Sequence, residues 1–268
     1  MGAALQLNTD RMIAEKDGGI GWITFNNPAR HNAVSVAMWE AIPQILDDYE
    51  NDPDVRVVVL KGAGEKAFVS GADISEFGER RNSPEAVAEY NRISGDAHVR
   101  LQKCPKPVIA MIRGYCFGGG TGIAVTCDMR IASDDAIFAV PAAKLGLGYA
   151  ADGIKRLMDL VGPSYAKEIF YTARRFTADE AHGMGLANRV VPAAELESYV
   201  RDYATTIAGN APLTIGAVKI AVAELLKPDD EADLSLADAA VDRCFKSSDY
   251  VEGRTAFMEK RKPNFQGQ

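Results

Sequence analysis

Two stretches of this chain carry glycines where a predicted strand turns into a predicted helix. The first runs from Lys106 to Asp128 and has three consecutive glycines, Gly118 to Gly120, after the apolar run Val108 to Ile112. A strand that enters a helix through a glycine turn leaves unpaired backbone N–H groups at the positive end of the helix dipole. Because glycine has no Cβ, a ligand can approach this backbone closely. The pattern predicts an anion site made of main chain, suited to a phosphate or to an oxyanion that develops during a reaction.

The order of residues in the glycine run argues against the two common phosphate loops. A P-loop needs Lys and Ser or Thr after its last glycine, whereas Thr121-Gly122-Ile123 follow here, and the dinucleotide fingerprint Gly-x-Gly-x-x-Gly is not met. Taken alone, glycines that only let a helix pack on a strand are an equal alternative. The second stretch, Gly62 to Ile74, again passes from a short strand through Gly71-Ala72-Asp73 towards a helix. Two sets of backbone N–H groups are therefore available to converge on one oxygen.

Hydrophobic periodicity indicates the elements that position these turns. Met12 to Lys16 and Ile20 to Asn26 alternate around a glycine turn and predict a β-hairpin. Ser35 is a plausible N-cap for a helix with one apolar stripe, and Val55 to Lys61 is the next buried strand. After Pro192 the pattern changes to amphipathic helices with little β signal, over 196–208, 212–226, 234–245 and 250–261. We therefore predict a core over residues 1–194 and a helical segment over residues 195–268.

Composition and charge narrow the classes of partner. The chain has 268 residues, of which 47% are hydrophobic and 25% charged, as in ordinary globular proteins. Its net charge of −7 argues against nucleic acid or an anionic membrane as the main partner. We find no signal peptide and no apolar run long enough for a membrane span. The four cysteines have no C-x-x-C spacing, which predicts neither a metal site nor a disulfide framework and fits a reducing cytoplasm: Cys104, Cys116, Cys127 and Cys244.

Motifs along nearly the whole chain resemble the crotonase (enoyl-CoA hydratase/isomerase) superfamily. They are Asn26-Asn27-Pro28 with Asn32-Ala33, GAGEKAFVSGADI, KPVIAMIRGYCFGGG followed by CDMRIAS, the segment 138–157, and the tail DYVEGRTAFMEKRKPNF. The resemblance implies an α/β (α+β) fold, a spiral of strand–strand–helix units followed by C-terminal helices that build a homotrimer, commonly paired into a hexamer. It also implies an enzyme of fatty acid metabolism that acts on an acyl-CoA, with no cofactor beyond the coenzyme A of the substrate.

The resemblance assigns roles to particular positions. Family members hold the thioester oxygen with two backbone N–H groups so that an enolate can form beside it, and the matching positions here are Ala72 and Gly119. The positions that the resemblance places along the substrate and its coenzyme A are Arg30, His31, Ala33, Gly71, Asp73, Ile74, Gly118, Phe257 and Lys260. For Asp73, a cap of the following helix is a stronger alternative to this contact role. For Arg30 and His31, a position in a solvated surface loop is an equal alternative.

The acid–base side chains of the family's hydratases are missing. Those enzymes use two glutamates to position a water molecule and move its protons. The matching positions here hold Gly122 and Ala142, and neither side chain carries a proton. The resemblance therefore disfavours ordinary hydration and favours isomerase- or decarboxylase-type chemistry.

Tyr149 and Asp152 are the nearby candidates for acid–base work. Ala150-Ala151-Asp152 resembles the context of the catalytic aspartate in dienoyl-CoA isomerases, and Tyr149 stands in a Leu-Gly-x-x-Tyr context like that of methylmalonyl-CoA decarboxylases. If a helix begins near Tyr149, the i, i+3 spacing puts both side chains on one face. A helix cap for Asp152 and a packing aromatic for Tyr149 are the alternatives.

A serine hydrolase built on Ser70 would need a histidine partner, and neither glycine stretch contains one. His98 and His182 lie in helical surroundings and are predicted to be structural. A non-catalytic acyl-CoA-binding homologue is the alternative to an enzyme.

Overall fold

Strands of two sheets form the centre of the chain, in the computed structural model that describes residues 5–73, 76 and 83–268. The strands are β1 (Met12–Asp17), β2 (Ile20–Phe25), β3 (Val57–Gly62), β4 (Ala67–Val69), β5 (Val108–Ile112), β6 (Tyr115–Phe117), β7 (Met129–Ser133), β8 (Ile137–Ala139), β9 (Phe176–Thr177) and β10 (Arg189–Val191). The larger sheet has the order β1-β2-β3-β5-β7-β10 and the smaller one the order β4-β6-β8-β9. Neighbouring strands are parallel except for the pairs β1–β2 and β8–β9.

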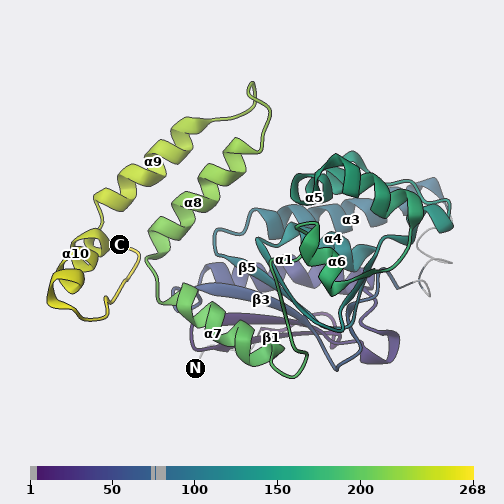
Figure 1. Cartoon of the computed structure of the whole chain (residues 1–268), viewed down its shortest axis with the longest axis horizontal. Coiled ribbons are helices and arrows are strands. Elements are labelled where there is room, and N and C mark those ends of the chain that lie inside the picture. Colours follow the sequence, from purple (N-terminus) through teal and green to yellow (C-terminus); the bar gives the residue numbers. More distant parts are fainter. Residues whose placement is uncertain (1–4, 74–75, 77–82) are drawn as a thin grey trace.

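Helices follow the strands and surround them (Figure 1). They are α1 (Val36–Glu50), α3 (Pro84–Gln102), α4 (Gly119–Thr126), α5 (Ala151–Thr172), α6 (Ala178–Gly183), α7 (Leu196–Ala208), α8 (Pro212–Leu225), α9 (Leu234–Phe245) and α10 (Ser248–Glu259), with the 3-10 turns η1 (Pro28–Arg30) and η3 (Pro141–Lys144).

The chain alternates between the two sheets as it advances. β3, β5 and β7 lie in the larger sheet, and each is followed by a short strand of the smaller sheet, β4, β6 and β8 respectively. A helix then follows before the next strand of the larger sheet, as α4 does after β6. This repetition of strand, strand and helix confirms the predicted α/β spiral.

The larger sheet is buried on both faces. Val58 and Leu60 of β3 pack into the cluster that contains the buried residues of α1, α3 and α4. The alternate residues Val57 and Val59 pack with Leu196 and other residues of α7 on the opposite face, because successive side chains of a strand point to opposite sides. The predicted boundary at 194/195 therefore falls before a helix that packs on the core sheet.

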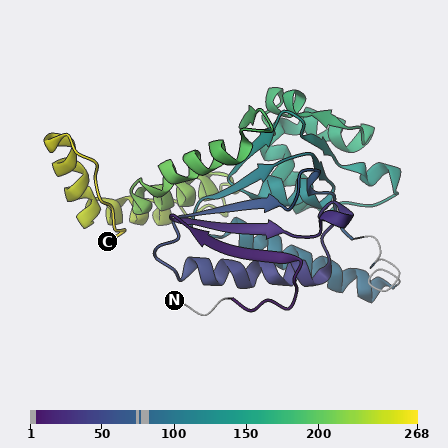
Figure 2. The ribbon, with the colours of Figure 1, turned by 90° about the horizontal axis from the view of Figure 1, so that it is seen from below.

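The helices α8, α9 and α10 project away from this core. Figures 1 and 2 show them as an arm at one end of the molecule, with α8 and α9 side by side and α10 at the far end. Among the described residues, no single helix is long and apolar enough to cross a membrane. The pair α7 and α8, bent by 101°, reaches that length and composition only when the two are taken together.

Most elements agree with the periodicity of the sequence, and one junction differs. The hairpin β1–β2, the helix α1 after Ser35 and the four C-terminal helices are confirmed. However, the strand that leads directly into the glycine run is β6, which lies in the smaller sheet, and not β5. The turn at Gly114 therefore moves the chain from one sheet to the other, and the helix start is reached from the second strand.

Candidate active site

Two glycine turns leave the same edge of the smaller sheet. β4 and β6 are parallel neighbours, so their carboxyl ends lie side by side, and Gly71-Ala72 follow the first while Gly118-Gly119 follow the second. Gly71 has φ +118° and Gly118 has φ +51°, values that favour glycine because a Cβ would be strained there. A Cβ at Gly120 would lie 2.1 Å from the backbone oxygen of Val69, so a glycine is also needed where α4 starts against β4.

The amides of Ala72 and Gly119 have no acceptor in the described part of the chain. Val34 N donates to Gly71 O at 2.8 Å, and Asp73 N donates to Val34 O at 2.9 Å. This parallel bridge uses the residues on either side of Ala72, so the N–H of Ala72 faces the opposite direction. Gly119 is the first residue of α4, whose initial amides have no intrahelical partner. Within residues 5–73, 76 and 83–268, neither amide donates a hydrogen bond.

The two free amides lie next to each other. A Cβ at Gly119 would lie 3.7 Å from Ala72 N and 3.8 Å from Gly71 Cα. Gly118 N, by contrast, donates to Ala139 O at 2.8 Å, so Gly118 supplies the turn and not a free donor. Two unpaired N–H groups beside each other at a helix N-terminus are suited to an oxyanion. Their contact with a thioester oxygen stays a prediction.

The two positions that the resemblance matches to the hydratase glutamates hold no carboxylate. Gly122 lies one turn along α4 from Gly119, and Ala142 is buried in η3. Asp152 is exposed in the first turn of α5. The N-cap of α5 is Ala150, so the alternative in which Asp152 caps this helix is wrong.

Tyr149 does not share a helical face with Asp152. The helix α5 begins at Ala151, two residues after Tyr149, so the i, i+3 spacing does not apply. The ring of Tyr149 packs edge-on against Phe170 with ring centroids 4.9 Å apart, and it contributes to the main hydrophobic cluster. This placement supports the packing role that the sequence left open for this residue.

His98 lies beside Gly122, and the sequence did not single it out for the site. A Cβ at Gly122 would lie 3.2 Å from His98 Nε2. His98 Nδ1 lies 2.7 Å from the backbone oxygen of Ser94, and the imidazole ring packs against Trp39 with centroids 5.0 Å apart. The pKa of His98 is lowered to about 4, mainly by burial and also by the positive charge of Arg156, while the hydrogen bond to Ser94 opposes this shift. The imidazole is therefore neutral near pH 7.

Asp73 is a buried carboxylate held by two arginines. Its side chain is only 2% exposed and accepts from Arg30 Nη1 at 2.9 Å, while Arg11 Nη1 lies 3.6 Å from its other oxygen. The guanidinium of Arg30 is half exposed, so part of it remains open to solvent. Asp73 therefore links its own loop to the segments that carry Arg11 and Arg30. The predicted contact residue Ile74 lies outside the described residues.

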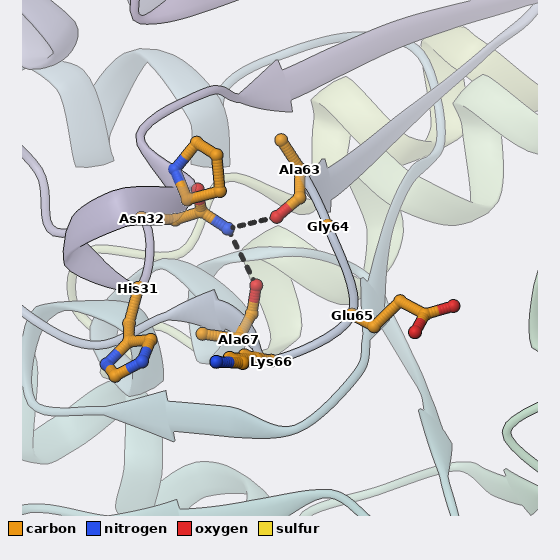
Figure 3. A pocket seen from close by; sticks show the side chains of 8 residues that line it. His31, Asn32, Ala63, Gly64, Glu65, Lys66 and Ala67 are labelled. Atoms are coloured by element: carbon orange, nitrogen blue, oxygen red, sulfur yellow. Dashed lines mark hydrogen bonds between the residues drawn. The ribbon is translucent and has the colours of Figure 1, made fainter.

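His31 lines a surface pocket of about 320 Å³, shown in Figure 3. Asn32 fixes this loop, because its Nδ2 donates to Ala63 O at 3.0 Å and to Ala67 O at 2.7 Å. Neither Ala72 nor Gly119 lines the pocket, so it is separate from the free amides. The predicted contact residue Ala33 is buried, and its backbone N–H and carbonyl are both hydrogen-bonded within the loop.

Two other predictions concern more distant residues. Phe257 and Lys260 lie at the end of α10, which both overall views place at the tip of the arm, so a single chain does not bring them to the free amides. The hydroxyl of Ser70 donates to the backbone oxygen of Arg30 at 3.2 Å. No histidine side chain among the described residues hydrogen-bonds Ser70, which leaves the hydrolase alternative without support.

The fold and the paired amides together define a crotonase-type protein. A family model described as Enoyl-CoA hydratase/isomerase matches residues 15–268. The chain belongs to this family of enzymes that act on acyl-CoA thioesters.

Relatives and solved structures of similar length agree with this membership. The chain is 38% identical to the short-chain-enoyl-CoA hydratase of Clostridium acetobutylicum over 256 residues, covering 96% of this chain and 97% of the relative. It is 35% identical to the carnitinyl-CoA dehydratase of Proteus mirabilis over 271 residues, covering all of both chains. It also resembles the crystal structure of an enoyl-CoA hydratase/carnithine racemase from Magnetospirillum magneticum, with a TM-score of 0.91, 35% identity and 97% of each chain covered.

Proposed function

We propose that this protein forms a thioester enolate from an acyl-CoA and stabilises it with the amides of Ala72 and Gly119. The observation that carries the proposal is the pair of adjacent N–H groups, one of them at the N-terminus of α4, that donate to no acceptor among the described residues. Donors fixed before the reaction stabilise the developing negative charge without reorganisation, and each such donor contributes about 10²–10³ in rate.

The reaction that we propose is a double-bond shift or a decarboxylation. Gly122 and Ala142 cannot position or activate water, whereas a double-bond shift needs only a group that removes a proton at one carbon and returns it at another. Decarboxylation needs no initial proton abstraction. In this proposal Asp152 serves as an acid or base, and Tyr149 lies beside a departing carboxylate.

A panel of substrates tests this proposal. We expect a 3-enoyl-CoA, a dienoyl-CoA or a malonyl-type CoA to react, and hydration of crotonyl-CoA to be slower by about 10² or more, the usual contribution of a missing acid–base group. Hydration of crotonyl-CoA as fast as the reaction of the best of these other substrates would contradict the proposal. It would favour the activity after which the Clostridium acetobutylicum relative is named. If none of these substrates reacts while butyryl-CoA still raises the melting temperature, the protein is a non-catalytic acyl-CoA binder.

The role of Asp152 has its own test. We expect Asp152→Asn to lower kcat by about 10²–10⁴ and to leave the affinity for coenzyme A nearly unchanged, because the substitution removes the proton-transfer group and keeps the shape of the side chain. An unchanged kcat would remove Asp152 from the mechanism.

We also propose that the arm formed by α8, α9 and α10 joins copies of this chain into a trimer or hexamer. Large apolar side chains are exposed on all three helices in the single chain: Leu225, Leu226, Phe245, Val251, Phe257 and Met258. Exposed apolar patches of this kind favour protein–protein contact. Light scattering should show an oligomer that Leu225→Asp dissociates, and because Leu225 is 70% exposed in the single chain we expect the variant to stay folded. A monomeric wild-type protein would contradict this proposal.

A further inference from the structure

The imidazole of His98 occupies the space beside Gly122 that a longer side chain at this position would need. His98 Nε2 would lie 3.2 Å from a Cβ at Gly122, and its Cε1 would lie 4.0 Å from it. Any larger side chain at position 122 would have to displace the ring. The ring of His98 on α3 therefore fills the space that the lack of a side chain at Gly122 on α4 leaves open. The position that lacks a glutamate is thus next to an ionisable group.

The hydrogen bond of His98 determines which ring nitrogen is basic. Nδ1 lies 2.7 Å from the backbone oxygen of Ser94, and a carbonyl oxygen can only accept, so Nδ1 carries the hydrogen in the neutral ring. Nε2 then holds the lone pair. Among the described residues nothing donates to Nε2, and it is not fully enclosed. The ring thus presents an unoccupied basic nitrogen towards α4.

Packing holds the ring in this orientation. Trp39 of α1 stacks on it at an interplanar angle of 36°, and the indole Nε1 of Trp39 in turn donates to Tyr90 Oη at 3.1 Å. The contacts of His98 therefore come from α1 on one side and from the preceding turn of α3 on the other. A nitrogen held in this way needs little reorganisation before it takes a proton.

The basic nitrogen lies near the proposed oxyanion site. Gly119 and Gly122 are three residues apart in α4, so they lie on the same side of the helix, separated by a rise of about 4.5 Å. Figure 1 shows α3, α4 and α5 together on one side of the core. For Nε2 to act on a thioester whose oxygen is held by the Gly119 amide, the carbons next to the carbonyl must lie along this side of α4.

Burial and one nearby charge keep His98 neutral. Burial lowers the pKa of His98, and the positive charge of Arg156, from α5, lowers it as well. Burial also lowers the pKa of Arg156, while Asp152, one turn earlier in α5, raises it. A neutral imidazole can accept a proton at neutral pH without first losing one.

We propose that His98 is the base that forms the enolate, in place of a side chain at position 122. Nε2 takes a proton from the α-carbon of the acyl group, the electron pair of the broken C–H bond moves towards the thioester oxygen, and the N–H groups of Ala72 and Gly119 hold the charge. The imidazolium returns the proton to the α-carbon in simple exchange, and in a double-bond shift it passes the proton to Asp152, which delivers it to the γ-carbon. No other reactant is consumed. The inference rests on the proposed function and names the group that performs its first step.

Exchange of the α-protons of butyryl-CoA in D2O tests this step apart from the overall reaction. Butyryl-CoA has no double bond to move and no carboxylate to lose, so mass spectrometry reports enolate formation alone. We expect exchange with the wild-type protein and a loss of about 10²–10⁴ in rate with His98→Gln, while the affinity for butyryl-CoA changes little. His182→Gln is the matched control, because His182 Nδ1 contacts the backbone oxygen of Ala187 at 3.0 Å in a similar way on α6.

A second variant guards against loss of structure in the first. In His98→Ala/Gly122→Glu the ring is removed and a carboxylate takes its place on α4, and we expect it to recover at least tenfold of the exchange rate that His98→Ala loses. Wild-type exchange in folded His98→Gln, or no recovery in the folded double variant, would overturn the role of His98 and leave the proposed function standing. No exchange by the wild-type protein, which still binds butyryl-CoA, would overturn the role of His98 and the double-bond shift, and it would leave decarboxylation to be tested with the malonyl-type CoA.

Discussion

Gly119→Ala separates the chemistry of the paired amides from the stability of the fold. A Cβ at this position would lie 3.7 Å from Ala72 N and 3.7 Å from Gly71 C, which are ordinary van der Waals distances. Gly119 does not have a left-handed backbone, so alanine introduces no strain there. In a helix, alanine is favoured over glycine by roughly 0.5–1 kcal/mol. The variant should therefore fold with an unchanged or slightly raised melting temperature.

The same methyl group faces the space between the two amides. A substrate oxygen held by both would lie about 2.7–3.1 Å from each nitrogen, so the methyl competes with it for this space. We expect Gly119→Ala to lower kcat by about 10²–10³, the effect of losing one donor, which corresponds to about 2.7–4 kcal/mol of transition-state stabilisation. Gly183→Ala is the matched control, because nothing lies within 4 Å of a Cβ there.

The assay measures α-proton exchange of butyryl-CoA together with the thermal unfolding of each variant. We expect the exchange rate to fall in Gly119→Ala and to stay at the wild-type value in Gly183→Ala, with both proteins folded. Wild-type exchange in Gly119→Ala would refute the geometric reasoning. A drop in melting temperature of several degrees would refute the reasoning about stability.

Three further predictions concern stability. Gly120→Ala should abolish folding or strongly lower the melting temperature, because its Cβ would lie 2.1 Å from Val69 O; a stable variant would show that α4 can move. Since the pKa of His98 is about 4 in the folded chain and about 6.5 in the unfolded one, the unfolded state binds the extra proton between these values. The free energy of unfolding should fall by about 2 kcal/mol from about pH 7.5 to about pH 5, and urea titrations should show a smaller fall in His98→Gln. Arg30→Ala should destabilise the protein by about 1–3 kcal/mol, because it removes the nearer partner of the buried Asp73; an unchanged urea midpoint would contradict this.

The sequence predicted the long elements well because their patterns are local. The apolar stripe after Ser35 and the alternation in β1 and β2 each extend over several residues, and both were confirmed. The three-residue strand β6 is too short to carry a pattern, and its existence depends on pairing with β4 and β8. The glycine turn was therefore predicted correctly, but the short strand directly before it was not predicted.

The side chains of the site were harder to predict because they meet through tertiary contacts. Gly122 and His98 are far apart in sequence and come together only when α3 packs on α4. The one signal in the sequence was the glycine at position 122, which indicated that a residue from another element must fill the space beside it. The partners of Asp73 could not be inferred for the same reason, since Arg11 and Arg30 reach it from another part of the chain.

A crystal structure of the protein with bound butyryl-CoA tests the central claim most directly. This ligand keeps the thioester carbonyl and cannot isomerise or lose a carboxylate. The paired amides predict its oxygen within about 2.7–3.1 Å of both Ala72 N and Gly119 N. An oxygen bound elsewhere, or either amide hydrogen-bonded to a protein carbonyl in the complex, would contradict the account.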